Sequence, residues 1–224
     1  ARVIPASGER GAPTHGDPRM LVRPVQKADE SDAGFVLRVA HQNGLARPVW
    51  LGAALGTSVA ARDLGRARWC GACLSEQEPW WRAAWVRGPA LCAAHQCWLE
   101  DACPACGREG NWRSLRLLRC WCAADLSSST ISPWSDDVRA LLAVPSDTFG
   151  EGWAGLTVDS RWRVAKLLGA LDQHGLHGKP LKRATAARVE VERRLVTVGA
   201  ALMLGAPRSI ADLLVRIRSV PIAG

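Results

Sequence analysis

Four closely spaced pairs of metal-binding residue types lie between positions 70 and 122 of this chain, and they constrain its fold more than any other feature. Seven of the eight cysteines, together with one histidine, make up the pairs Cys70/Cys73, Cys92/His95, Cys103/Cys106 and Cys120/Cys122. A C-x2-C turn places two sulfurs on the same side of one ion, and zinc takes four sulfur or nitrogen ligands in a tetrahedron. The pattern therefore predicts two structural Zn²⁺ sites, with Cys97 as the one cysteine left over.

Sequential pairing is the simplest assignment of the ligands, with the first two pairs on one ion and the last two pairs on the other. A cross-braced RING arrangement would end in C-x2-C, whereas this chain ends the region in Cys120-x-Cys122, which argues against ubiquitin-ligase chemistry. A disulfide framework ranks well below zinc, because such frameworks belong to short secreted chains and no export signal is evident. Thiolate ligands suit a reducing compartment, so we expect a cytoplasmic protein.

The rest of the chain predicts a mainly α fold with small β zinc ribbons. Residues 1–20 are rich in Gly, Pro, Ala and Arg, which predicts a flexible arm. An N-terminal helical region over 21–67 follows, then a tandem zinc-ribbon region over 68–125 and a C-terminal helical bundle over 130–224. Within the zinc region we expect short strands over 80–86 and 115–120, one leading into the second pair of each site.

Helix start and stop signals are clearest near the N-terminus. Ser31 is a predicted N-cap, and Asn43-Gly44 is a left-handed stop. A second short helix is expected over 48–55, and two helices joined by a Gly-containing turn resemble the start of a helix-turn-helix. Further helices are expected over 133–144, 160–173, 186–204 and 207–218.

The formal net charge of +8 is concentrated at the C-terminal end. From position 161 onward the chain carries 12 of its 29 Lys and Arg residues but only 4 of its 21 Asp and Glu residues. A basic helical segment indicates a surface for a nucleic-acid backbone or for an acidic protein, and a merely solvated face is an equally good interpretation of charge alone. The candidate surface residues are Lys182, Arg183, Arg188, Arg193, Arg194, Arg216 and Arg218.

Nothing in the sequence predicts catalysis. The chain has no G-x4-G-K-[ST] phosphate loop, and its acidic residues are scattered. Both predicted zinc sites are filled by four protein ligands, which leaves no position for a reactive water. Cys97 is expected to be a buried packing residue. Eleven Trp against two Phe and no Tyr is unusual, and seven of them lie in or beside the cysteine region, where we expect them to fill a small core.

The cysteine region resembles the signature of the TniQ/TnsD family of transposition target-selection proteins. Members of that family have an aromatic residue before C-x2-C-L, an aromatic-Trp-Arg segment, a C-x2-H-x-C-x-L box and a second C-x2-C-G. The matching positions here are Trp69, Leu74, Trp81, Arg82, Trp85, Cys97, Leu99 and Gly107. The resemblance extends over 21–125 and is looser across the C-terminal helices. One departure is Ala93, where the family often has Pro.

The resemblance implies a non-catalytic adaptor in DNA transposition. Proteins of this family connect a target-recognition complex, in some elements a CRISPR effector with guide RNA, to an AAA+ ATPase regulator (TnsC- or TniB-like) that recruits the transposase. TnsD-like members instead bind a specific DNA site themselves. The expected partners are therefore the ATPase regulator, the CRISPR effector in RNA-guided elements, and DNA near the target site, with no membrane partner. The sequence leaves three points open: the target, the use of a guide RNA, and the oligomeric state, for which a homodimer is one alternative.

Overall fold

The computed structural model describes residues 22–45, 51, 66–112, 115–143, 153, 155–176, 179, 182, 188–206 and 208–219. In this part of the chain the fold is mainly helical and holds one small two-stranded sheet. Its elements are α1 (Asp32–Gln42), α3 (Gly71–Leu74), α4 (Ala84–Arg87), β1 (Leu91–Cys92), β2 (Cys97–Trp98), η3 (Leu126–Ser128), α5 (Asp136–Leu142), α6 (Val158–His174), α8 (Val189–Leu204) and α9 (Arg208–Ser219).

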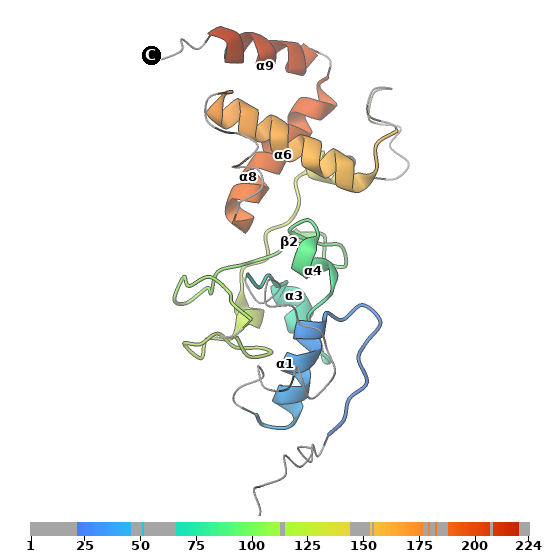
Figure 1. Ribbon diagram of the computed structural model, residues 1–224, viewed down its shortest axis with the longest axis vertical. Helices are drawn as coiled ribbons and strands as arrows, with labels where there is room; N and C mark the ends of the chain where they lie inside the picture. Colours follow the sequence, from blue (N-terminus) through green and yellow to red (C-terminus); the bar gives the residue numbers. More distant parts are fainter. Residues whose placement is uncertain are drawn as a thin grey trace, which may run out of the picture.

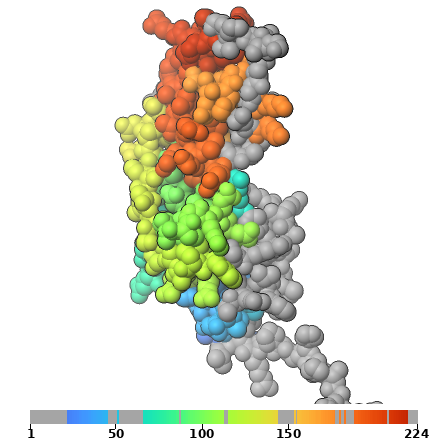
Figure 2. Space-filling model, turned by 90° about the vertical axis from the view of Figure 1, so that its left-hand side faces the viewer, coloured from blue at the N-terminus to red at the C-terminus, as the bar shows by residue number. Residues whose placement is uncertain are grey.

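The molecule is elongated, and the cysteine-rich segment forms its middle. In Figure 1, α1 lies at one end next to α3, whereas α6, α8 and α9 lie together at the other end. Figure 2 shows the same order along the long axis from another side. No helix among the described residues has the length and apolar character that a membrane crossing needs.

Helix α1 forms as its end signals predict. The Ser31 hydroxyl accepts a hydrogen bond from the backbone N–H of Gly34 at 3.0 Å, which satisfies one of the free donors of the first turn. Asn43 follows the last helical residue, and Gly44 takes a φ of 66°. Gly34 has no room for a side chain, because a Cβ there would lie 2.6 Å from the Cβ of Trp81. The predicted helix over 48–55 lies outside the described residues, Leu51 excepted, and so does the helix-turn-helix that it would complete.

Four buried tryptophans form the centre of the cysteine-rich segment. The Trp81 ring lies 6.0 Å from that of Trp69, 6.1 Å from that of Trp85 and 4.8 Å from that of Trp112, measured between centroids. Trp81 Nε1 donates to the carbonyl of Leu117 at 2.9 Å, so its polar end is satisfied. The prediction of a tryptophan-filled core is confirmed for these four residues.

The two strands predicted in this segment are wrong. Over 80–86 the chain instead makes one isolated bridge, from Arg82 to Glu30, and then begins the short helix α4; Trp81 and Trp85 are both buried in the tryptophan core. Over 115–120 the backbone makes a tight turn, in which Arg116 N–H donates to the carbonyl of Arg119 at 2.9 Å, and only Arg119 forms an isolated bridge. The sheet is instead the antiparallel hairpin of β1 and β2, in which Cys92 pairs with Cys97.

The C-terminal helices form as predicted, with bounds shifted by a few residues. The Ser135 and Thr157 side chains cap the first turns of α5 and α6. Helices α6 and α8 pack closely at two glycines: a Cβ on Gly169 would lie 1.9 Å from the carbonyl oxygen of Leu195, and one on Gly199 would lie 1.8 Å from that of Ala165. Small residues at this crossing allow the two backbones to approach each other.

Two buried contacts illustrate how these helices join the cysteine-rich segment. The rings of Trp98, from β2, and Trp162, from α6, lie 5.6 Å apart in a shared buried cluster. The buried carboxylate of Asp101 accepts a hydrogen bond at 3.0 Å from the backbone N–H of Val189, the first residue of α8. An acidic side chain at that position satisfies a free donor and interacts favourably with the helix dipole.

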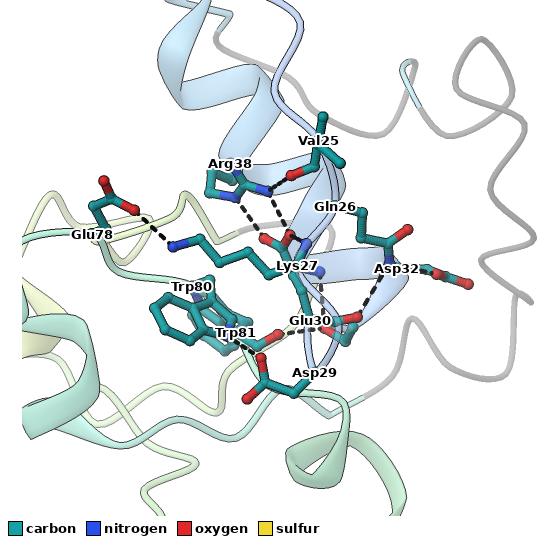
Figure 3. Close-up of polar contacts among 12 residues, drawn as sticks. Val25, Gln26, Lys27, Asp29, Glu30, Asp32, Arg38, Glu78, Trp80 and Trp81 are labelled. Atoms are coloured by element: carbon teal, nitrogen blue, oxygen red, sulfur yellow. Dashed lines mark hydrogen bonds and ion pairs between the residues drawn. The ribbon is translucent and has the colours of Figure 1, made fainter. Parts of the chain in front are cut away.

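A network of charged side chains fixes the segment before α1 (Figure 3). Glu30 and Arg38 form a buried ion pair, with Arg38 Nη2 at 2.6 Å from Glu30 Oε2 and Nε at 2.7 Å from Oε1. Lys27 Nζ lies 4.0 Å from the centroid of the Trp80 ring and 2.8 Å from a carboxylate oxygen of Glu78. The hydrogen bonds that Arg38 donates to the Glu30 carboxylate raise the pKa of Arg38 despite the opposing effect of burial.

Candidate metal centres

The first group of donors comes from three local elements. Cys70 caps α3 and Cys73 lies within it, so one short helix presents both sulfurs. Cys92 ends β1, and His95 lies in the turn of the hairpin. The Nδ1 atom of His95 lies 3.2 Å from the sulfur of Cys73, 3.6 Å from that of Cys92 and 3.7 Å from that of Cys70. All four donor atoms lie within 4.8 Å of one another, as the sequential assignment predicts.

The surroundings of this group favour thiolate and imidazole ligands. The other ring nitrogen of His95, Nε2, lies 3.5 Å from a carboxylate oxygen of Glu76, which orients the ring so that Nδ1 faces the sulfurs. Hydrogen bonds from the thiols of Cys70 and Cys73, of which Cys70 has the larger effect, hold the pKa of Cys92 well below its usual range. Burial lowers the pKa of Arg82, but hydrogen bonds to Cys73 and Asp29 outweigh it and raise that pKa. A cation therefore lies beside the thiolate cluster.

The second group is built from turns and lies nearer to solvent. Gly107, with a φ of 67°, donates its N–H to the Cys103 carbonyl at 2.9 Å and so closes the loop that holds the first two sulfurs. The sulfur of Cys103 lies 3.7 Å from that of Cys122, and the sulfur of Cys106 lies 3.8 Å from that of Cys120. Cys103 and Cys120 are buried, whereas Cys106 and Cys122 are exposed.

The pKa values of the two buried thiols in this group, Cys103 and Cys120, shift in opposite directions. Burial opposes ionisation of Cys103, but the backbone N–H groups of Cys106 and Ala105 outweigh it and lower the pKa of Cys103 to about 7. Burial raises the pKa of Cys120 to about 12. Of these two buried thiols, Cys103 therefore ionises first, and a bound cation has to displace the proton of Cys120.

Both donor sets fit a structural metal ion. Each offers four soft or borderline donors close enough for one tetrahedral ion, and the two groups could hold two metal ions. The S–S separations of 3.5–3.8 Å agree with the edge of about 3.8 Å expected for a tetrahedron with metal–sulfur bonds of about 2.3 Å. Four protein ligands leave no free coordination position, so neither group resembles a hydrolytic metal site.

Sequence reasoning did not place Cys97 beside the first donor group. It is buried, as expected of a packing cysteine, but its sulfur lies 3.6 Å from that of Cys70, a member of that group. The spacing Cys92-x4-Cys97 carried a signal for this position, because a short hairpin closed by two paired cysteines points both side chains to one face of the sheet.

The predicted basic surface divides into paired and unpaired residues. Arg188 forms an ion pair with Glu109, Arg216 with Asp172, and Arg193 donates to the hydroxyl of Ser132. Lys182 is exposed, and Arg183 lies outside the described residues. The two remaining candidates, Arg194 and Arg218, are exposed and form no ion pair within the described part of the chain.

The tryptophans of the cysteine-rich segment divide into buried and exposed residues. Trp121 stands between two donors of the second group and is 72% exposed, unlike the core tryptophans.

The chain matches no protein-family model, no curated protein and no solved structure.

Proposed function

We propose that both cysteine groups bind structural Zn²⁺ and that the protein is a TniQ-like, non-catalytic adaptor in DNA transposition. The observation that carries the proposal is the pairing of two four-donor groups within the segment that carries the TniQ/TnsD resemblance. Filled tetrahedral sites stabilise small folds and do no chemistry of their own, which suits a platform for partners. The zinc-ribbon description of the two modules belongs to this proposal.

The adaptor would link a target-recognition complex to an AAA+ ATPase regulator that recruits the transposase. In elements with RNA-guided targeting, the recognition complex is a CRISPR effector. The exposed cations Arg194 and Arg218 support contact with an acidic partner or with DNA near the target, because they have no ion-pair partner in the described part of the chain. The paired cations Arg188 and Arg216 are less suited to such a contact, because their charges are already compensated.

The second candidate is a TnsD-like protein that binds a specific DNA site itself. The unevenly placed net charge of +8 favours it, since a basic face binds phosphates through release of counterions. It predicts tight binding to one duplex, with an affinity that falls steeply as salt rises.

Co-sedimentation with the AAA+ regulator of the same element, with ATP and non-specific DNA, distinguishes the two candidates. Capture that requires the ATPase supports the adaptor, whereas equal binding to DNA alone supports the DNA reader. Arg194→Glu and Arg218→Glu should weaken whichever binding is observed, and Arg216→Glu is a control that breaks an ion pair with Asp172 in the same region. Capture by neither the ATPase nor DNA would rule out both candidates.

A further inference from the structure

The first donor group has four members, and Cys97 beside it adds a fifth metal-binding side chain for the four positions of a tetrahedral ion. Cys97 lies opposite Cys92 in the β1–β2 hairpin, and paired residues in a sheet project to the same face. Its sulfur lies 3.6 Å from that of Cys70, and the sulfurs of Cys73 and Cys92 lie 3.5 Å apart. Both separations are close to the edge of about 3.8 Å in a tetrahedral zinc–thiolate site.

We propose that Cys97 is a further zinc ligand of this group, able to replace His95 while Cys70, Cys73 and Cys92 stay bound. The inference rests on the zinc occupancy proposed above, but not on the adaptor function. It gives the first site two ligand sets, three thiolates with one imidazole or four thiolates. In the exchange the His95–zinc bond breaks, the Cys97 thiol loses its proton to solvent, and the Cys97–zinc bond forms.

The positions of the two competing donors favour such an exchange. The side chain of His95 is 30% exposed, and its Nε2 contacts the surface carboxylate of Glu76. His95 can therefore leave the ion without disturbing the core. Cys97 is only 2% exposed and is held by the hairpin, so it stays close to the ion. A buried thiol this close to a zinc–thiolate cluster needs little movement to bind.

The additional negative charge of a four-thiolate site has a counterion within reach. The guanidinium of Arg82 interacts with Cys73 and is anchored by Asp29. Its Nε is buried and has no hydrogen-bond acceptor among the described residues. A cation beside the cluster stabilises added thiolate charge in a low-dielectric environment.

The test uses the zinc-loaded protein and three variants: His95→Ala, Cys97→Ala and the double variant, which alone leaves only three donors. Zinc per chain is measured after dialysis against a chelator, and X-ray absorption gives the average number of sulfurs per zinc. We expect both single variants to keep two zinc ions, and the double variant to lose one. The average should be about 4 sulfurs in His95→Ala and about 3.5 in Cys97→Ala.

Two results would overturn the inference. One is loss of a zinc ion from His95→Ala as readily as from the double variant. The other is retention of zinc in His95→Ala with an average of about 3.5 sulfurs, because water would then fill the vacant position. A wild-type protein with fewer than two zinc ions would instead contradict the zinc proposal itself.

Cys97→Ala provides an independent measurement if His95→Ala does not fold, as judged by the near-ultraviolet circular dichroism of the buried tryptophans. Without the alternative donor, we expect zinc to leave the first site faster by about tenfold or more. An unchanged rate of release to the chelator would also refute the role of Cys97.

Discussion

The glycines at the crossing of α6 and α8 set how closely the two C-terminal helices pack, and Gly169→Ala tests this packing. The added Cβ would lie 1.9 Å from the carbonyl oxygen of Leu195, whereas ordinary contact begins at 3.4 Å, so the helices must separate by about 1.5 Å at this point. The neighbouring residues Ala165, Val196 and Ala200 are fully buried and would lose contacts as the helices part. A gap of only 0.5–1 Å already removes about a quarter to a half of a dispersion contact.

The net effect follows from two opposing contributions. Overpacking of a core costs about 3 kcal/mol at the upper end of its usual range, and the gap required here places Gly169→Ala at that end. Replacing a mid-helix Gly by Ala contributes about 1 kcal/mol in the opposite direction. We therefore expect a destabilisation of about 2 kcal/mol, which corresponds to a melting temperature lower by about 4–8 °C for a chain of this size.

Scanning calorimetry measures the shift, and Gly155→Ala is the matched control. Among the described residues, a Cβ at Gly155 would meet no atom within 4 Å, so that variant should stay within about 0.5 kcal/mol of the wild type. Gly199→Ala creates a second clash, 1.8 Å from the Ala165 carbonyl oxygen, which the same separation of the helices relieves. The double variant should therefore cost less than the sum of the single ones. A Gly169→Ala melting temperature equal to that of the control would refute the reasoning.

Three further changes test other parts of the fold. Glu30→Ala leaves Arg38 without its buried carboxylate partner, and we expect a loss of about 3–5 kcal/mol in denaturant unfolding; a loss under about 1 kcal/mol would mean that water replaces the partner. Asp101→Ala removes the acceptor of the first N–H of α8, so hydrogen exchange at Val189 should accelerate, and stability should fall by about 1 kcal/mol; unchanged exchange would contradict the cap. Cys103→Ser should lose one zinc ion and lower the melting temperature, and an unaltered zinc content would show that Cys103 is not a ligand.

Local signals in the sequence predicted the features that depend on neighbouring residues. The cap at Ser31 and the stop at Asn43 define α1, because capping hydrogen bonds join residues within one turn. The short spacing within each cysteine pair predicted the two donor groups in the same way. The strand predicted over 80–86 is wrong, because this segment makes only an isolated bridge at Arg82 before the short helix α4 begins at Ala84.

Contacts between distant positions could not be predicted from one sequence. Asp101 and Val189 are separated by 88 positions, and no local pattern indicates that one caps the other. The ion pair of Glu30 with Arg38 depends on how the segment before α1 folds back along that helix (Figure 3). The place of Cys97 in the first donor group depends on the register of a hairpin whose strands have only two residues each.

The segment from Cys97 to Asp101 makes the metal region and the C-terminal helices dependent on each other. Within five positions it places a sulfur 3.6 Å from that of Cys70, the Trp98 ring in the helical core and the carboxylate that caps α8. Between them, Glu100 exchanges backbone hydrogen bonds with Trp69, directly before the first member of the donor group. Because consecutive residues contact the first donor group and the helices, loss of a metal ion bound there would loosen the packing of both. The proposed adaptor, which would have to hold two partner surfaces in a fixed relation, would benefit from this coupling.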